Sequence, residues 1–258
     1  MEAESGSDPI DGSTPGADTP REWGLTPRIR ARAVAVAEIL LCSSVLTQVL
    51  IGAALALWGW SPFDGDQLSL RFVVTLSIAD TLLLIALMVL LTRAHGESVK
   101  ALWIGDRPVA REAIVGLLLV PAVFLMVVVL LNVLRIAAPW LHNVPTNPLE
   151  QLAATPGQAA LFALVAILAG GVREELQRAF LLRRFERHLG GVTTGIVVLS
   201  VAFGLGHVVQ GWDAVITTGT LGAFWAVLYV RRRSVIAPMV SHAGFNTIEV
   251  VRVAIVGL

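Results

Sequence analysis

Seven apolar stretches, each long enough to cross a bilayer as a helix, dominate this chain of 258 residues. A hydrocarbon core about 30 Å thick is crossed by about 20 helical residues. The composition agrees, because 55% of the residues are hydrophobic and only 15% are charged. The sequence therefore predicts an all-α, polytopic transmembrane bundle with seven spans at 33–60, 70–93, 113–134, 158–182, 192–209, 213–230 and 234–257.

The first 26 residues differ from the rest, because they are rich in Pro, Gly, Ser and acidic residues and nearly devoid of apolar ones. Such a segment does not bury enough surface to order itself, so residues 1–26 are predicted to form a disordered tail. The tail lacks the basic and apolar regions of a signal peptide. Residues 27–258 are predicted to form the transmembrane helical domain.

Basic residues alternate between the two sides of the predicted bundle. They crowd the connections on one side, whereas only Arg71 and Arg135 stand at span ends on the other. The positive-inside rule places the arginine-rich side and the N-terminus in the cytoplasm. We expect an integral protein of a bacterial plasma membrane, in contact with lipid. The loop at 97–112 is the expected place for an eighth, partial span lying in the interface.

Charge gives no reason to expect a nucleic-acid partner. Lys plus Arg and Asp plus Glu are balanced at 19 each, and no basic stripe with interleaved aromatic residues occurs. An ionised residue within a span costs at least a few kcal/mol and points to function or to a partner. Most such residues follow position 170. The two that precede it, Glu38 and Asp80, are expected to have interhelical partners or to line a cavity. Among the later residues, Glu249 is expected to pair with Arg252 at i,i+3.

The first polar cluster is G-G-V-R-E-E-L-Q-R, residues 170–178. On a helix, Glu174 and Arg178 are four residues apart and meet on one face, and Glu175 also lies within reach of Arg178. The two glycines one turn earlier leave volume free beside Glu174. The alternative is a helix end that carries solvated charges.

Two further motifs stand in later spans: Phe203 and His207 form F-x-x-x-H, and His242 and Asn246 form H-x-x-x-N. Glycines on both sides of His207 allow the chain to bend there. Alone, each motif is typical of hydrogen bonding between helices. Together with the glutamate pair they supply the groups of a hydrolytic site. Glutamate takes a proton from water or holds a metal that activates it, two imidazoles and a carboxylate suit zinc, and Asn and His donate to an oxyanion.

A glutamate pair followed by arginine, then F-x-x-x-H, then H-x-x-x-N resembles the CPBP family of intramembrane proteases. That family includes the type II CAAX prenyl endopeptidases and the bacteriocin-immunity proteins. The resemblance covers roughly residues 158–250. The family pattern has three residues between the pair and the arginine, whereas E-E-L-Q-R has two. The family pattern therefore aligns with either the glutamate pair or Arg178, and we align it with the pair.

The resemblance implies an endopeptidase whose catalytic half is about 158–258 and whose cavity opens to the cytosolic side. Glu174 and His207 would activate water, and His242 and Asn246 would stabilise the oxyanion. Glu175 and Arg178, with Phe203, would orient the site or the peptide or protein substrate. If a metal is bound, zinc would be held by Glu174, His207 and His242, and a metal-free mechanism is the alternative. Two other classes compete. A non-catalytic scaffold or immunity-type protein would use these residues to join helices, and a proton-coupled transporter would have inverted repeats.

Overall fold

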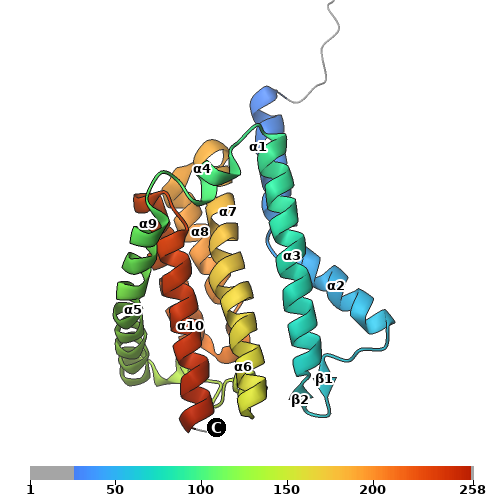
Figure 1. Ribbon diagram of the computed structural model, residues 1–258, viewed down its shortest axis with the longest axis vertical. Helices are drawn as coiled ribbons and strands as arrows, with labels where there is room; N and C mark the ends of the chain where they lie inside the picture. Colours follow the sequence, from blue (N-terminus) through green and yellow to red (C-terminus); the bar gives the residue numbers. More distant parts are fainter. Residues whose placement is uncertain (1–25, 257–258) are drawn as a thin grey trace, which may run out of the picture.

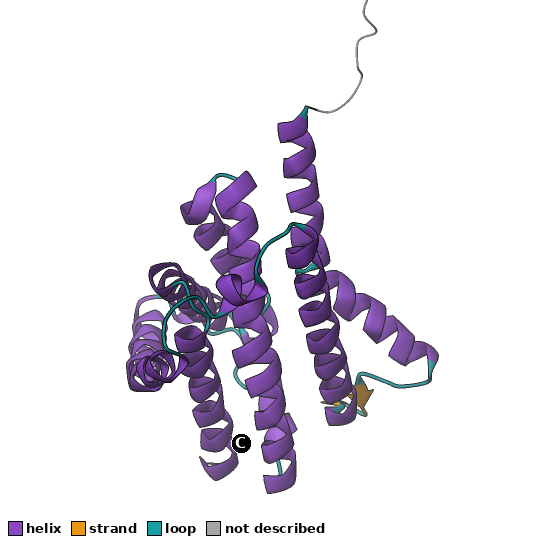
Figure 2. Cartoon of the chain, turned by 45° about the horizontal axis from the view of Figure 1, so that its top comes forward, coloured by secondary structure: helices purple, strands orange, loops and turns teal. Residues whose placement is uncertain are grey.

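The computed structural model describes residues 26–256, and nearly all of this range is helical (Figure 2). The first part contains α1 (Pro27–Leu41), α2 (Val45–Leu57), α3 (Leu70–Ala94), α4 (Val99–Trp103) and α5 (Val109–Ala137). A small antiparallel hairpin, β1 (Phe63–Asp64) and β2 (Gln67–Leu68), precedes α3. The second part contains α6 (Pro156–Val165), α7 (Glu174–His188), α8 (Gly191–Leu205), α9 (Trp212–Arg232) and α10 (Ile236–Val256). Short 3₁₀ turns lie at Pro139–Leu141, Pro148–Ala153 and Val208–Gln210.

The helices form two groups with α6 and α7 between them (Figure 1). On one side stand α1 and α3, with α2 leaning away from both. On the other side stand α5, α9 and α10. Helix α7 contacts α1, α3, α8 and α9, and the helical segment that precedes it, Ala166–Arg173, contacts α3 and α10. The helix from α6 to α7 therefore joins the two halves of the chain.

Each of the seven apolar stretches is largely helical, which confirms the all-α prediction. Within the described residues, three helices are able to cross a membrane by length and composition: α3, α5 and α9. The pair α1 and α2 is a fourth if it is counted as one broken span. Seven spans thus stays a prediction, as does the orientation of the N-terminus. The predicted tail lies outside the described residues except for Thr26.

The first predicted span is broken in the middle. Helix α1 ends at Leu41, α2 begins at Val45, and the two axes differ by 42°. Ser44 adopts a left-handed conformation with φ of 69°, and the Ser43 hydroxyl donates to the carbonyl of Leu40 at 2.8 Å. Serine side chains compete with the helix for backbone hydrogen bonds, and the two adjacent serines end α1 here.

The fifth predicted span ends earlier than residue 209, because α8 ends at Leu205. A turn follows, and Gly211 has φ of 109°, a conformation that favours glycine. His207 therefore lies just beyond α8 in this turn and not on a helix. The bend that the glycines allow is present.

The segment from α6 to α7 is one long helix with an irregular centre. A capping box starts it: Gln158 N–H donates to the Thr155 hydroxyl at 3.3 Å, and Thr155 N–H donates to the Gln158 side chain at 3.1 Å. Residues Ala166–Arg173 form a π-helical segment, which α7 continues. Such segments occur often at functional sites, and this one ends directly before the glutamate pair.

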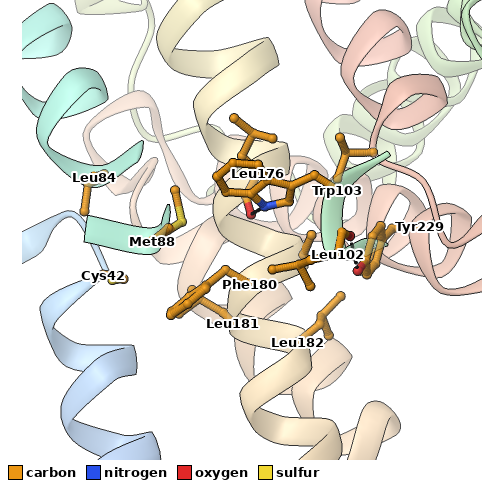
Figure 3. Close-up of a cluster of buried hydrophobic side chains, with 13 residues drawn as sticks. Cys42, Leu84, Met88, Leu102, Trp103, Leu176, Phe180, Leu181, Leu182 and Tyr229 are labelled. Atoms are coloured by element: carbon orange, nitrogen blue, oxygen red, sulfur yellow. Dashed lines mark hydrogen bonds between the residues drawn. The ribbon is translucent and has the colours of Figure 1, made fainter. Parts of the chain in front are cut away.

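The main apolar core surrounds α7. Figure 3 shows its side chains Leu176, Phe180, Leu181 and Leu182 at the centre of the cluster, with residues of α3 and of α4 on either side. Two hydrogen bonds tie α4 in place: the Trp103 indole donates to the Leu176 carbonyl at 3.2 Å, and the Tyr229 hydroxyl donates to the Leu102 carbonyl at 2.9 Å. The expected interfacial span at 97–112 is thus only a five-residue helix, α4, whose Leu102 and Trp103 are buried in protein.

Close packing of small residues fixes the π-helical segment against α10. A Cβ atom added at Gly171 would stand 2.6 Å from the Cβ of Ala243 and 2.8 Å from its Cα. Small residues allow two helix backbones to approach in this way. The spacing between the glutamates and the α10 histidine therefore depends on Gly171.

Replacing Gly171 by alanine should force these two segments apart. We expect Gly171→Ala to lower the free energy of unfolding by about 1–3 kcal/mol, the usual cost of overpacking. Gly157→Ala is the matched control, because a Cβ there meets nothing within 4 Å. Thermal unfolding of both variants in detergent tests this, and equal melting temperatures would contradict the packing argument.

At the arginine-rich end, Glu186 links α7 to the turn between α9 and α10. Arg233 donates to its Oε1 at 3.0 Å and Arg183 donates to its Oε2 at 2.9 Å. The hydrogen bond from Arg233, with that from Arg183, holds the pKa of Glu186 below its ordinary value. Because the carboxyl pKa is lower in the folded protein, the ionised group stabilises the fold at pH values above the ordinary carboxyl pKa. This stabilisation is lost as the pH falls through the lowered pKa.

The melting temperature of the wild type should therefore fall more steeply in acid than that of Glu186→Gln. The amide has no charge to lose, so the two curves should converge once Glu186 is protonated. Melting temperature against pH for both proteins at low salt, where exposed charges are least screened, measures the difference. Parallel curves over the whole range would show that the pair contributes nothing.

Candidate functional site

The glutamate pair begins α7 immediately after the π-helical segment. Successive helical residues point about 100° apart, so the two side chains enter different surroundings. Glu175 is 2% exposed and faces the protein interior, whereas the side chain of Glu174 is 20% exposed and lines a cavity. The pair therefore divides into one buried carboxylate and one accessible carboxylate.

The ionic partners differ from the expected i,i+4 pair. Arg178 pairs with Glu175, three residues earlier, and not with Glu174. Glu174 instead accepts a hydrogen bond from Nη2 of Arg173 at 3.1 Å. The prediction that Glu174 and Arg178 meet is wrong. Arg173 is the nearer opposite charge for Glu174, and Glu175 is the nearer one for Arg178.

His242 is held from three directions. Its Nδ1 lies 2.8 Å from Oε1 of Glu175, Trp225 stacks on its ring with centroids 3.8 Å apart, and Phe203 meets it edge-on at 6.2 Å. An ionised carboxylate only accepts hydrogen bonds, so Nδ1 carries a proton and donates it to Glu175. Nε2 then points toward Glu174, 3.9 Å from its Oε2. His242 is 4% exposed, and these contacts fix the orientation of its ring.

Phe203 connects the second motif to this cluster. The Arg178 guanidinium lies 4.9 Å from the centre of its ring, within the range of cation–π attraction. The ring also packs on Gly222 of α9, where an added Cβ would lie 2.9 Å from Cδ1 of Phe203. Phe203 is thus a packing residue shared by Arg178 and His242.

His207 has a defined tautomer. Its Nδ1 lies 2.8 Å from the carbonyl oxygen of Phe203. A carbonyl accepts only, so Nδ1 is the donor, and in the neutral ring the lone pair of Nε2 is left to accept a proton. A lone pair of this kind is what a general base requires.

Asn246 faces the π-helical segment. Its amide donates to the carbonyl of Ala166 at 3.1 Å and lies against Gly170, where an added Cβ would collide with it. This bond uses one of the two amide hydrogens, so the second is left to donate elsewhere. The glycine thus makes room for the asparagine side chain.

One cavity of about 460 Å³ is lined by Glu174, His207, His242 and Asn246. The three motifs, from three separate segments of the chain, therefore meet around one space. The cavity also reaches residues 142–150 and Arg252, which lie at the end of the bundle opposite the arginine-rich connections. These lining residues do not support the expected opening of the cavity to the cytosolic side, which stays a prediction.

The predicted zinc ligands do not form a ligand set in this arrangement. Within residues 26–256, no group of three or more His, Cys, Asp or Glu side chains lies close enough to hold a metal ion. His242 uses Nδ1 for Glu175 and His207 uses Nδ1 for Phe203, so each would have to bind through Nε2. Zinc held through these nitrogens stays the alternative to a metal-free mechanism.

The other charged residues of the predicted spans have the partners expected of them. Glu38 pairs with Arg184 at 2.5 Å, Asp80 lies 3.8 Å from Arg173, and Arg252 donates to Glu249 at 3.0 Å. Two contacts were not anticipated from the sequence: the stacking of Trp225 on His242 and the position of Arg173 beside Glu174. A tryptophan in the middle of a span, away from the interfaces where this residue is usual, was the available signal for Trp225.

A family model described as type II CAAX prenyl endopeptidase Rce1-like matches residues 156–248. The matched range starts with α6, ends within α10 and contains every predicted site residue. The resemblance seen in the three motifs is thereby confirmed for this part of the chain. No curated protein and no solved structure matches the chain.

Glu175 should be essential to the stability of this cluster. Glu175→Gln leaves the Arg178 cation buried without its carboxylate, which typically costs about 3–5 kcal/mol. Glu249→Gln is the matched control, because its pair with Arg252 is partly exposed and worth about 0–1 kcal/mol. Denaturant unfolding in detergent compares the two, and an equal loss in both would show that burial of the Glu175 pair has no special effect.

Proposed function

Residues 156–248 belong to the Rce1-like family of type II CAAX prenyl endopeptidases, and from this premise we propose that the protein is an intramembrane endopeptidase acting through a water molecule activated by Glu174 and His207. Family membership and the apolar helices support a membrane protease. The observation that carries the finer proposal is that Glu174, His207, His242 and Asn246 line one cavity.

In the first step, the water oxygen attacks the carbonyl carbon of the scissile peptide bond. Its proton passes to the carboxylate of Glu174, the accessible member of the pair, and the Nε2 lone pair of His207 accepts the second hydrogen bond of the same water. Positioned bases of this kind contribute about 100- to 10,000-fold to rate. The product of the step is a tetrahedral intermediate that carries an oxyanion.

The oxyanion is stabilised by the free amide hydrogen of Asn246 and by Nε2–H of a protonated His242. In that form Nδ1–H donates to the Glu175 carboxylate, which orients the ring as a buried acid does for a catalytic histidine. The intermediate then collapses: the carbon–nitrogen bond breaks, the proton held by Glu174 passes to the leaving amine, and a carboxyl group remains on the other product.

Arg178 and Trp225 act indirectly. Arg178 pairs with Glu175 and lies against Phe203, and Trp225 stacks on His242. Both therefore hold the imidazole that faces the reacting group. The substrate class that fits the family name is a prenylated peptide near its C-terminus, and a membrane-proximal peptide without the lipid is the alternative substrate.

The main competing function is a non-catalytic scaffold or immunity-type protein, in which the same residues join helices. The contacts of Glu175, Arg178 and His242 suit such a role, since all three are buried and paired. Glu174 and His207 do not, because both face the cavity. Variants of these two residues therefore separate the functions.

The test uses purified protein in lipid nanodiscs and an internally quenched peptide that ends in farnesylated Cys-aliphatic-aliphatic-X, beside the same peptide without farnesyl. Wild type should cleave, and Glu174→Gln and His207→Ala should each lower kcat/KM by about 100- to 10,000-fold. Glu186→Gln and His188→Ala, on the same helix as Glu174 but away from the cavity, should cleave like wild type.

Melting temperatures of Glu174→Gln, His207→Ala and His188→Ala should stay near wild type at neutral pH, whereas Glu186→Gln should melt lower because it loses its pair with Arg233. Inactive wild type with both peptides, or loss of cleavage only in step with loss of folded protein, would favour the scaffold. Elemental analysis of active wild type and of His207→Ala decides the question of the metal. Stoichiometric zinc that is lost in the variant would replace the metal-free mechanism by a zinc-dependent one.

A further inference from the structure

We infer that Asp80 and Arg173 are positioning residues that hold Glu174 in its reactive orientation, an inference that rests on the proposed function. Arg173 occupies the position directly before the glutamate pair, and Asp80 belongs to α3 in the first half of the chain, outside the range matched by the family. A buried chain of polar contacts leads from α2 and α3 to the proposed base.

Arg173 is the centre of this chain. The residue is 6% exposed, and its guanidinium donates from Nη2 to Oε1 of Glu174 at 3.1 Å. From Nη1 it donates to the Ser44 hydroxyl at 2.5 Å and to Oε1 of Gln177 at 3.1 Å. The same nitrogen lies 3.8 Å from Oδ2 of Asp80. The two terminal nitrogens of the guanidinium thus bind different partners.

Asp80 is itself fixed from α2. Only 1% of the residue is exposed, Thr47 donates to its Oδ1, and Gln48 donates to its Oδ2 at 3.2 Å. The break between α1 and α2 adds to this support. It turns Ser44 toward Arg173, and it leaves the carbonyl of Cys42 to accept a hydrogen bond from Gln177 at 2.5 Å. The irregular backbone at 42–44 is therefore part of the support for Arg173.

The charges explain why the arrangement orients Glu174. One guanidinium stands between two carboxylates, so Asp80 keeps Arg173 from turning fully toward Glu174, and Arg173 holds only one oxygen of Glu174. The other oxygen, Oε2, is directed to the His242 side of the cavity. An arginine fork presents fixed donors to several partners, whereas a lysine presents one point charge. The geometry of Glu174 thus requires the fork as well as the charge.

The experiment measures kcat and KM separately with the farnesylated quenched peptide. Asp80→Asn keeps the shape of the side chain and removes its charge, and Arg173→Lys keeps the charge and removes the fork. Each should lower kcat by about 10- to 100-fold, since small misplacements of a reacting group have effects of this size. KM should change by less than about twofold, because neither residue lines the cavity.

Glu38→Gln is the matched control. Glu38 is likewise a buried carboxylate of the first half paired with an arginine of α7, Arg184, but that pair does not touch Glu174. This variant should lose stability while kcat stays at the wild-type value. Asp80→Glu, which restores the carboxylate, should recover part of the kcat that Asp80→Asn loses.

Glu174→Gln, assayed in parallel, separates the two hypotheses. If it cleaves like wild type, the proposed function fails. If it is inactive but Asp80→Asn has the kcat of Glu38→Gln, only the positioning role fails. Should Arg173→Lys not accumulate as folded protein, Asp80→Asn and Asp80→Glu decide alone. Equal kcat in these two, at any level, would overturn the inference.

Discussion

An ionised side chain inside an apolar bundle is stable only beside an opposite charge, because an unpaired buried ion costs several kcal/mol. Helix α7 and the residue before it depend on this constraint most. Arg173 has Glu174 and Asp80, Arg178 has Glu175, and Arg184 has Glu38. The pairs with Glu38 and Asp80 reach α1 and α3, so satisfying the charges of one helix also sets its position among its neighbours. The apolar packing around α7 then fills the space between these fixed points.

The candidate site has accessible groups backed by buried ones. Glu174 and His207 face the cavity, and each is oriented through a bond on the side away from it, by Arg173 or by the Phe203 carbonyl. His242 has the same arrangement with Glu175 and Trp225. Preorganised groups of this kind do not have to rearrange as charge develops. The first half of the chain, which carries none of the three motifs, contributes through Asp80 and the backbone break at Ser44.

Local patterns in the sequence predicted what depends on helical spacing. The three motifs meet at one cavity, Glu249 pairs with Arg252, and Glu38 and Asp80 have interhelical partners. Spacing alone was not sufficient where two partners competed. Glu174 has Arg173 beside it, so the expected bond to Arg178 does not form.

Features that depend on distant parts of the chain were not predictable in the same way. The stacking of Trp225 on His242 joins two helices whose relative rotation no periodicity reveals. The π-helical segment and the bend at Ser44 depend on backbone hydrogen bonds that side chains redirect, and residue patterns carry little record of these.

The order of the charged pairs along the chain has a consequence for assembly. The acids that neutralise Arg173 and Arg184, namely Asp80 and Glu38, belong to helices made earlier by the ribosome, and Arg178 finds Glu175 on its own helix. When this arginine-bearing helix emerges, its counter-ions already stand in the nascent bundle, so it can leave the insertion machinery neutralised. His242 and Arg233 are made later, and they add the contacts of Glu175 and Glu186 to a helix whose other charges already have partners.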